Sequence, residues 1–320
     1  MEWYHILLII LGAVLLLFVL PLFISSYFAF NYIFRRNNGE GKFEDLDLSV
    51  TPYKPYEEDI KNAIAFFKTL NPEVVNVKSH DGLRLQGYYY NNNSDVTVMF
   101  VHGYRASPLN NFSTVGKKMY EEGYNVFFID QRAHNASEGK YTTFGIKERY
   151  DVRTWLYKLN DLYNPKKVIL YGMSMGCASS EMALSLELPK NLKLAVLDCG
   201  FNGVFDLMMY QTQKRIKINP YLSVKIMNIY AKLFAGFDMF ETKSSDSLKE
   251  AKVPCFFIHG KKDDVVPFSH GLENYEACLT KKDCVFLEDV DHARCYYAGG
   301  KDLEEKLMNF IKEVLEEGEE

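Results

Sequence analysis

The first part of the chain is distinguished by a long apolar segment without charged residues. Asp, Glu, Lys and Arg are absent from Trp3 to Phe34, and Ile6–Ile24 consists mainly of Leu, Ile, Val and Phe. A helix over that run would extend roughly 28 Å, which is close to the hydrocarbon thickness of a bilayer. Aromatic residues flank the run on both sides, as they do at membrane surfaces. The pattern therefore predicts a membrane-spanning anchor over residues 1–35.

Two other interpretations of this segment fit its pattern less well. A cleaved signal peptide starts with basic residues and ends at a small-residue cleavage site, whereas this chain has the acidic Glu2 at its start. A buried helix of a globular protein is usually amphipathic, and this segment is apolar on every side. Arg35, Arg36 and Lys42 follow the segment, so the positive-inside rule places the rest of the chain in the cytoplasm. We expect a single-pass signal-anchor with a cytoplasmic body.

Residues 36–73 separate the apolar segment from the rest of the chain. Residues 36–55 are rich in Asn, Gly and charged residues and contain two prolines, which is typical of a linker. Apolar positions then recur every three or four residues from Tyr56 to Leu70, and they predict an amphipathic helix that ends before a proline. The pattern leaves open whether this helix braces the following domain or lies near the membrane.

From residue 74 onward, short apolar runs alternate with amphipathic segments. The turn signal Asp81-Gly82 joins Val74–Lys78 to Leu83–Tyr90 and predicts a hairpin. The later runs predict buried strands separated by helices, which is the pattern of a mostly parallel sheet covered on both faces. The expected strands are Val96–Val101, Asn125–Asp130, Val168–Tyr171, Leu194–Leu197, Pro254–Ile258 and Cys284–Leu287, and the expected helices include 109–122, 144–163 and 300–316. In such a sheet the functional residues follow the carboxyl ends of the strands.

Composition and cysteine spacing narrow the classes of function. The chain has 320 residues, of which 48% are hydrophobic and 25% charged, and its net charge of −5 leaves no basic footprint for nucleic acid. The six cysteines form no C-x-x-C motif and no zinc-type cluster. Neither a metal nor an organic cofactor is implied by the motifs of the chain. Buried free thiols are the expected state of the cysteines, with a Cys278–Cys284 bridge as the alternative for an extracellular protein.

A serine lies at the tip of one predicted turn. The sequence Gly172-Met173-Ser174-Met175-Gly176 follows the strand Val168–Tyr171 and precedes the predicted helix Cys177–Leu188. A strand, a sharp turn and a helix in this order lift the serine hydroxyl clear of the sheet. A serine hydroxyl becomes a nucleophile only beside a base, and the base needs an acid that fixes its tautomer. Ser174 is therefore a candidate nucleophile, and its partners should follow other strands.

Histidines and aspartates after the later strands are candidates for the base and the acid. His292 follows the last strand on a loop and precedes a small residue, so it fits a general base best. Asp263 and its neighbour Asp264 follow the strand that ends at Ile258 and are the candidate acids. The remaining histidines lie in the apolar segment, before a turn, beside a glycine, on another loop or on a helix: His5, His80, His102, His134, His259 and His270.

These motifs together resemble those of the α/β-hydrolase superfamily, most of all its serine aminopeptidase-like and dienelactone-hydrolase-like branches. The resemblance covers roughly residues 74–316 and is carried by His102-Gly103, Asp130-x-Arg132, Gly172-x-Ser174-x-Gly176, His259-Gly260-x-x-Asp263 and Asp291-His292-Ala293. It implies an α/β-hydrolase fold with a mostly parallel central sheet and helices on both faces. It also implies the chain order nucleophile Ser174, acid Asp263 and base His292, with the backbone N–H groups of Tyr104 and Met175 as the oxyanion hole.

One loop departs from the family pattern. Ala133 and Asn135 stand where many relatives have glycines, in the loop that follows Asp130. We expect this loop to have a structural role, with Asp130 and Arg132 paired to each other, so that the departure does not affect catalysis.

The alternation of strands and helices is interrupted at about residues 201–250. This insertion is rich in Met, Phe, Tyr and Ile, and the resemblance implies that it forms a helical cap over the site. Most of these side chains must pack the cap onto the body. The sharper hypothesis is that some of them, with Met208, Met209 and Met227 as candidates, line an adaptable acyl pocket.

The sequence thus predicts a membrane-anchored serine hydrolase whose catalytic domain comprises residues 74–318. It would cleave a carboxylic ester or thioester through an acyl-enzyme intermediate. Its partners would be a small-molecule or acyl-group substrate and the bilayer, and not nucleic acid. A serine peptidase, a hydrolase-fold acyltransferase and a non-catalytic binding protein of the same fold remain alternatives. The sequence leaves the oligomeric state and the physiological substrate open.

Overall fold

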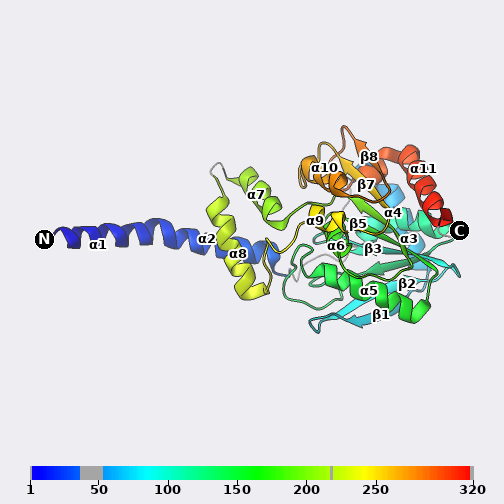
Figure 1. Cartoon of the computed structure of the whole chain (residues 1–320), viewed down its shortest axis with the longest axis horizontal. Helices are drawn as coiled ribbons and strands as arrows, with labels where there is room; N and C mark the ends of the chain where they lie inside the picture. Colours follow the sequence, from blue (N-terminus) through cyan, green and yellow to red (C-terminus); the bar gives the residue numbers. More distant parts are fainter. Residues whose placement is uncertain (1, 37–52, 217–218, 318–320) are drawn as a thin grey trace.

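The computed structural model describes residues 2–36, 53–216 and 219–317 of the chain. Its centre is an eight-stranded sheet in the order β1-β2-β4-β3-β5-β6-β7-β8 (Figure 1). The β1–β2 and β2–β4 pairs are antiparallel, and every later pair is parallel. The strands are β1 (Glu73–Lys78), β2 (Arg84–Tyr90), β3 (Val96–Val101), β4 (Asn125–Ile129), β5 (Lys167–Met173), β6 (Leu192–Asp198), β7 (Cys255–Gly260) and β8 (Lys282–Leu287). The predicted hairpin and the mostly parallel sheet are confirmed.

Helices cover both faces of this sheet, and alternate residues of each central strand point to opposite faces. In β3, Val98 and Phe100 belong to one core cluster, whereas Met99 and Val101 belong to the other. Burial on both faces explains why these strands are continuous apolar runs in the sequence. One face carries α3 (Glu57–Thr69), α4 (Pro108–Glu121) and α11 (Cys295–Glu316), and the other carries α5 (Glu148–Tyr163), α6 (Met175–Ala183) and α10 (Phe268–Ala277).

Two predicted helices begin elsewhere than expected. α5 begins at Glu148 because Phe144 and Gly145 have φ angles of 53° and 99°, which a helix does not accommodate. The Glu148 carboxylate accepts the Gly145 N–H at 2.9 Å and so closes the preceding loop. α11 begins at Cys295 and includes a non-helical residue, Gly300, with φ of 51°. The predicted start at residue 300 therefore coincides with this kink inside the helix and not with the first residue of the helix.

α6 is shorter than predicted. It ends at Ala183 and not at Leu188, because tight turns replace the helical hydrogen-bond pattern beyond it.

The structure also shows where the helix before the sheet lies. In α3, the ring of Phe67 packs against Tyr90 and Phe128 of the sheet at centroid distances of 4.9 and 5.1 Å. The helix therefore braces the sheet. Most of the predicted linker, residues 36–55, lies outside the described residues.

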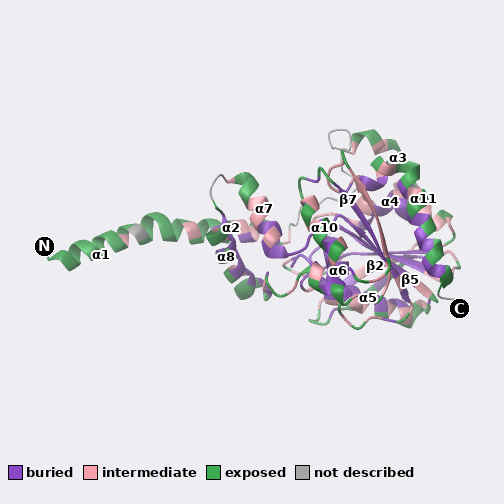
Figure 2. Ribbon diagram, turned by 45° about the horizontal axis from the view of Figure 1, so that its top comes forward, coloured by how far each residue is buried: buried purple, intermediate pink, exposed green. Residues whose placement is uncertain are grey.

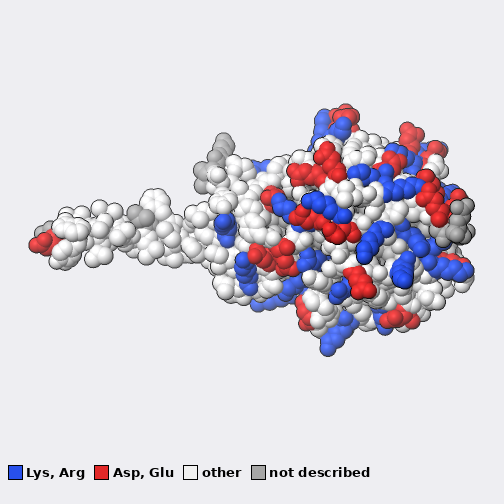
Figure 3. All heavy atoms as spheres, viewed as in Figure 1, with Lys and Arg blue, Asp and Glu red and all other residues white. Residues whose placement is uncertain are grey.

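The N-terminal segment is one almost continuous helix. It consists of α1 (Trp3–Val14), a π-helical stretch (Leu15–Val19) and α2 (Leu20–Phe34), and it is long and apolar enough to cross a membrane. α1 projects away from the body, and its surface is uncharged beyond Glu2 (Figures 1 and 3). Figure 2 shows the helix as mostly exposed, with burial beginning in α2 where it meets α8.

The insertion between β6 and β7 forms a helical cap. Its elements are α7 (Val204–Arg215), α8 (Tyr221–Tyr230), the π-helical turn η5 (Ala231–Ala235) and α9 (Ser244–Lys249). Phe30 and Phe34 of α2 are fully buried in a third core cluster together with cap residues such as Val224 and Met227. The base of the N-terminal helix is thus part of the folded body.

Candidate active site

Ser174 occupies a strained turn between β5 and α6. Its φ and ψ are 55° and −118°, a conformation that non-glycine residues rarely adopt. The flanking glycines make the turn feasible: a Cβ at Gly172 would lie 2.6 Å from the Gly176 carbonyl oxygen, and a Cβ at Gly176 would collide with the Val101 carbonyl. The turn therefore holds a half-buried serine hydroxyl at the carboxyl edge of the sheet.

The three residues expected to act together are in hydrogen-bond contact. His292 Nε2 lies 2.8 Å from Ser174 Oγ, and His292 Nδ1 lies 2.6 Å from Asp263 Oδ2. These residues are separated by up to 118 positions in the chain, and the sheet brings them together from the ends of β5, β7 and β8. An imidazole that donates from Nδ1 to a carboxylate presents Nε2 as the acceptor for the serine proton.

The surroundings of Asp263 favour its ionised form. Burial opposes ionisation of this carboxyl, but hydrogen bonds from His259 and His292 outweigh burial and hold its pKa well below the usual range. Its second oxygen, Oδ1, accepts the N–H groups of Val265 and Val266 at 2.9 and 2.7 Å. The carboxylate is thereby fixed in charge and in orientation. Asp264, the alternative acid, is exposed and pairs with Lys214 at 3.0 Å.

Sequence reasoning missed the contribution of His259. Its Nε2 lies 3.4 Å from Asp263 Oδ2 and 3.0 Å from the Val266 carbonyl oxygen, and its side chain is buried. Its position between a strand and a glycine gives no local indication of a role in the site. In the structure this histidine and His292 both contact the same oxygen of Asp263, Oδ2, and the four-residue spacing to Asp263 was the available signal.

The loop that carries His292 is fastened to the turn after β7. The Asp291 carboxylate accepts the His292 N–H at 2.7 Å and the Asp264 N–H at 3.2 Å, and it pairs with Arg294 at 3.0 Å. A Cβ at Gly260 would collide with the Val290 carbonyl, so the two loops approach closely. This packing fixes the position from which the imidazole reaches Ser174.

The expected oxyanion residues flank Ser174 on two elements. Met175 is the first residue of α6, where backbone N–H groups point out of the helix end. Tyr104 follows Gly103, at which a Cβ would lie 3.3 Å from the Ser174 Cβ. The Gly103 N–H donates to Asn111 Oδ1 at 2.7 Å, which fixes this loop beside the serine. Met175 thus adjoins Ser174 in the chain, and Tyr104 follows a residue that lies against Ser174; their role as oxyanion donors stays a prediction.

Buried histidines support the same loop. Burial, reinforced by the neighbouring His134, lowers the pKa of His102 to about 3, so this imidazole is neutral. His102 Nε2 accepts the Gln131 N–H at 3.1 Å, and Nδ1 lies 2.7 Å from the Gly103 carbonyl oxygen. His134 Nε2 accepts the Arg105 N–H at 3.0 Å. Both histidines thus hydrogen-bond to the backbone of the loops around them.

The loop after β4 differs from expectation. Asp130 and Arg132 do not pair: Arg132 binds Asp151 at 2.6 Å and Asp81 at 2.8 Å. Asp130 instead accepts the Asn135 side-chain amide at 3.0 Å. The predicted local pair is therefore wrong, because the guanidinium of Arg132 is buried and its partners come from α5 and the β1–β2 turn. Ala133 and Asn135, which replace family glycines, both have positive φ, 60° and 44°.

A second buried carboxyl lies beside the site at the end of β6. Complete burial raises the pKa of Asp198 to about 7, although the neighbouring Cys199 favours its charged form. Its backbone carbonyl accepts the Ser174 N–H at 2.8 Å.

The side chains of Cys199, Asp263 and His292 lie close enough together to resemble a set of metal ligands, but the imidazole and the carboxylate are already hydrogen-bonded to each other. All six cysteines are free, including Cys278 and Cys284.

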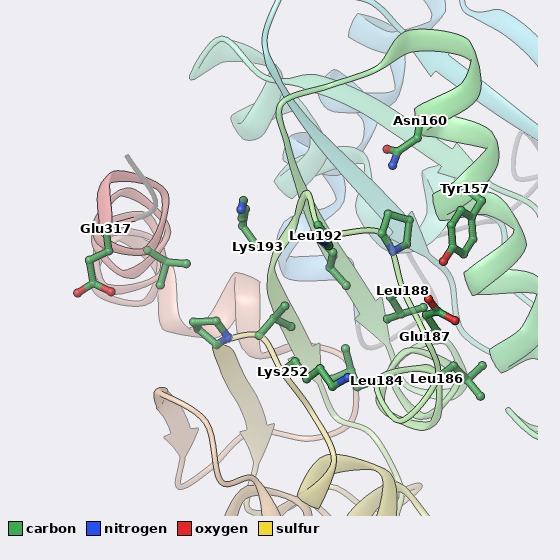
Figure 4. A pocket seen from close by; sticks show the side chains of 15 residues that line it. Tyr157, Asn160, Leu184, Leu186, Glu187, Leu188, Leu192, Lys193, Lys252 and Glu317 are labelled. Carbon is green, nitrogen blue, oxygen red and sulfur yellow. The ribbon is translucent and has the colours of Figure 1, made fainter. Parts of the chain in front are cut away.

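A cavity of about 800 Å³ lies elsewhere on the molecule. Most of its lining comes from two segments, 184–193 and 252–254, which precede or begin β6 and β7 (Figure 4). The cavity therefore opens at the amino edge of these parallel strands, whereas Ser174, Asp263 and His292 lie at the carboxyl edge. It is not the catalytic pocket.

Sequence relatives align with most of the length of the chain. The uncharacterized protein YqkD of Bacillus subtilis is 23% identical over 77% of this chain and 81% of its own length. The α/β hydrolase domain-containing protein 17B of Homo sapiens is 25% identical over 70% of this chain and 68% of its own length. Both alignments include the greater part of the body, so the hydrolase resemblance extends well beyond single motifs.

Solved structures and a family model agree with this similarity. The esterase Pf2001 of Pyrococcus furiosus has a TM-score of 0.64 and 25% identity, over 79% of this chain and 93% of that chain. The acylaminoacyl peptidase of Pyrococcus horikoshii shares the fold, with a TM-score of 0.52 and 18% identity over 73% of this chain and 40% of that chain. The model of the prolyl oligopeptidase family matches residues 111–318. The chain is thus an α/β hydrolase, and it belongs to the prolyl oligopeptidase family.

Proposed function

We propose that this α/β hydrolase is a membrane-anchored serine hydrolase that cleaves a carboxylic ester or thioester. The observation that carries the proposal is the pair of contacts that His292 makes, 2.8 Å to Ser174 Oγ and 2.6 Å to Asp263 Oδ2. This arrangement is the one that a serine needs for nucleophilic attack at neutral pH.

The reaction would proceed through an acyl-enzyme. Ser174 Oγ attacks the substrate carbonyl carbon while His292 Nε2 takes the hydroxyl proton, and the carbonyl oxygen becomes an oxyanion. The N–H groups of Tyr104 and Met175 would stabilise that charge. The tetrahedral intermediate collapses as the alcohol or thiol leaves with the proton from Nε2. Water, deprotonated by the same imidazole, then releases the acid and restores Ser174. Throughout, Asp263 stabilises the imidazolium and does not itself take the proton.

An ester or thioester is favoured over a peptide bond by the structural relatives. The esterase of Pyrococcus furiosus matches over nearly its whole length, whereas the peptidase of Pyrococcus horikoshii matches over 40% of its own. The cap side chains Met208 and Met227 are buried in the same cluster as Met175, so they pack the cap onto the body. That some cap side chains also line an apolar acyl pocket stays a prediction. Peptide hydrolysis remains the second candidate because the family model is that of a peptidase family.

We further propose that the N-terminal helix crosses a bilayer over Ile6–Ile24 and that the body faces the cytoplasm. The helix from Trp3 to Phe34 is long and apolar enough for a span. Arg35 and Arg36 at its base support a cytoplasmic body by the positive-inside rule.

Substrate preference tests this proposal directly. The full chain in detergent micelles should be assayed with p-nitrophenyl esters of increasing acyl length and with aminoacyl p-nitroanilides, beside Ser174→Ala. Ester turnover that Ser174→Ala abolishes would support the proposal. Preferential cleavage of the anilides would favour the peptidase. A folded wild-type protein that turns over neither substrate would favour a binding protein. A chain shortened to start after Arg36 would be a poor substitute, since it would lack Phe30 and Phe34.

A further inference from the structure

The cap exposes large apolar side chains on the side away from the body. Leu222 and Ile229 of α8 and Leu233 of η5 are 58%, 47% and 70% exposed. Their spacing of seven and four residues places them along one side of the helix. The opposite side is buried, with Val224 and Met227 in the core cluster that contains Met175. Exposed apolar residues that share one side of a helix, unlike singly scattered ones, are a feature of binding surfaces.

This surface adjoins the N-terminal helix at the end of its apolar run. Tyr230 Oη donates to the Phe23 carbonyl at 3.1 Å, and Ser223 Oγ lies 3.1 Å from Ser26 Oγ. The ring of Tyr27 lies 5.4 Å from that of Tyr230. Because α8 meets α2 at residues 23–27, it lies beside the last turn of the predicted span Ile6–Ile24. Figure 1 shows α8 crossing α2 and not running along it.

The side chains at this junction suit the lipid headgroup layer. Tyr27, Phe28 and Tyr32 of α2 are 40%, 67% and 63% exposed, and Tyr and Phe at such a level are typical of membrane–water interfaces. On the cap, Phe234 is 51% exposed, and the exposed Lys225 lies 4.9 Å from the ring of Tyr221. A helix with one apolar side and lysines at its margin binds in the plane of a bilayer surface.

We propose that the exposed side of α8 and η5 is a second membrane-binding surface, whose partner is the headgroup layer of the bilayer that α1 crosses. It would hold the cap, and the Ser174 site that the cap adjoins, at the membrane surface, where an amphiphilic ester is at its highest local concentration. The inference rests on the proposed membrane crossing by α1. Continuity with α2 favours the bilayer over a second copy of the chain as the partner.

Quenching by brominated lipids tests the proposal on the full chain. The protein is reconstituted in phosphatidylcholine vesicles, with and without phosphatidylserine, whose acyl chains carry bromine just below the headgroups. In the background Trp3→Phe, Leu233→Trp reports the cap surface. Leu279→Trp is the matched control, because Leu279 is 75% exposed on the loop between α10 and β8. The wild-type Trp3 separately reports insertion of α1, since the other tryptophan, Trp155, is buried.

The expected result is strong quenching at Leu233→Trp, with emission shifted to shorter wavelength, and no quenching at Leu279→Trp. If wild-type Trp3 is quenched but Leu233→Trp is quenched no more than Leu279→Trp, the proposed membrane-binding surface on the cap is wrong, although α1 still inserts into the bilayer. If the tryptophan of Leu233→Trp is protected from aqueous acrylamide but is not quenched by the brominated lipids, a second copy of the chain covers the surface. That result would also contradict the proposed membrane-binding surface. Absence of Trp3 quenching would overturn the membrane crossing itself, and the cap surface with it.

Discussion

Replacing Phe34 with alanine should destabilise the folded body and not only the helix that carries the residue. The Phe34 ring is fully buried at the base of α2. It lies 5.3 Å from the ring of Phe144, in the loop before α5, and 5.5 Å from that of Phe237, beyond η5. The ring of Phe144 in turn lies 4.9 Å from that of Tyr104. One side chain therefore joins the helix, the cap and the candidate oxyanion loop.

The size of the effect follows from complete burial. Truncating a buried Phe to Ala costs about 3–5 kcal/mol, because apolar surface is lost and a cavity remains. In a chain longer than 250 residues each kcal/mol lowers Tm by at most about 2 °C, so a fall of roughly 5–10 °C is expected. Catalytic turnover should also fall, since Tyr104 Oη donates to the Ile33 carbonyl of the same helix at 2.7 Å.

Thermal unfolding of the full chain in detergent micelles, followed by the fluorescence of the buried Trp155, measures this effect. Phe28→Ala is the matched control, because Phe28 belongs to the same helix and is 67% exposed. Its Tm should stay within about 2 °C of wild type. If Phe34→Ala unfolds at the same temperature as wild type, the conclusion that α2 is part of the folded body is refuted.

Three further predictions concern the site and its supports. Asp263→Asn should lower kcat by about 10⁴-fold, because the amide stabilises the wrong imidazole tautomer, whereas Asp264→Asn, at an exposed position, should retain near wild-type kinetics. Arg132→Met should cost about 3–5 kcal/mol in denaturant unfolding, because it leaves the buried Asp151 carboxylate unpaired; an unchanged midpoint would contradict this. Asp198 has a folded-state pKa of about 7 against an ordinary 3.8, so the folded state binds the extra proton and loses stability as pH rises from about 4 to 7. Asp198→Asn should therefore gain stability relative to wild type across that pH range, and a gap that does not widen with pH would count against a buried, protonated carboxyl.

The sequence predicted the sheet and the candidate site residues because their signals are local. Each of Ser174, Asp263 and His292 lies within five residues of the carboxyl end of a strand, and parallel strands bring these ends to one edge of the sheet. The structure brings the three side chains into contact, as the motifs implied. Their roles in a reaction stay predictions.

The partners of Arg132 could not be predicted from a local pattern. Asp81 and Asp151 lie 51 and 19 positions away, so their proximity depends on how the β1–β2 turn and α5 pack around the sheet. Asp130 was the carboxylate closest in sequence, but its side chain is occupied by the loop that follows it.

The buried side of α2 was hidden by the uniform hydrophobicity of the segment. An apolar helix has no polar face, so the pattern does not show which side meets protein. In the structure the buried residues are Ser26, Phe30 and Phe34, spaced four apart along one side. The serine within this series was the one sequence signal that this side contacts protein.

Covalent labelling of the serine tests the central claim most directly. The full chain in micelles is treated with a fluorophosphonate probe, and the modified peptide is identified by mass spectrometry beside Ser174→Ala and His292→Ala. The account predicts a single adduct on Ser174 that is absent in the first variant and forms far more slowly in the second. A folded wild-type protein that forms no adduct, or forms it on another residue, would contradict the assignment of Ser174 as the nucleophile.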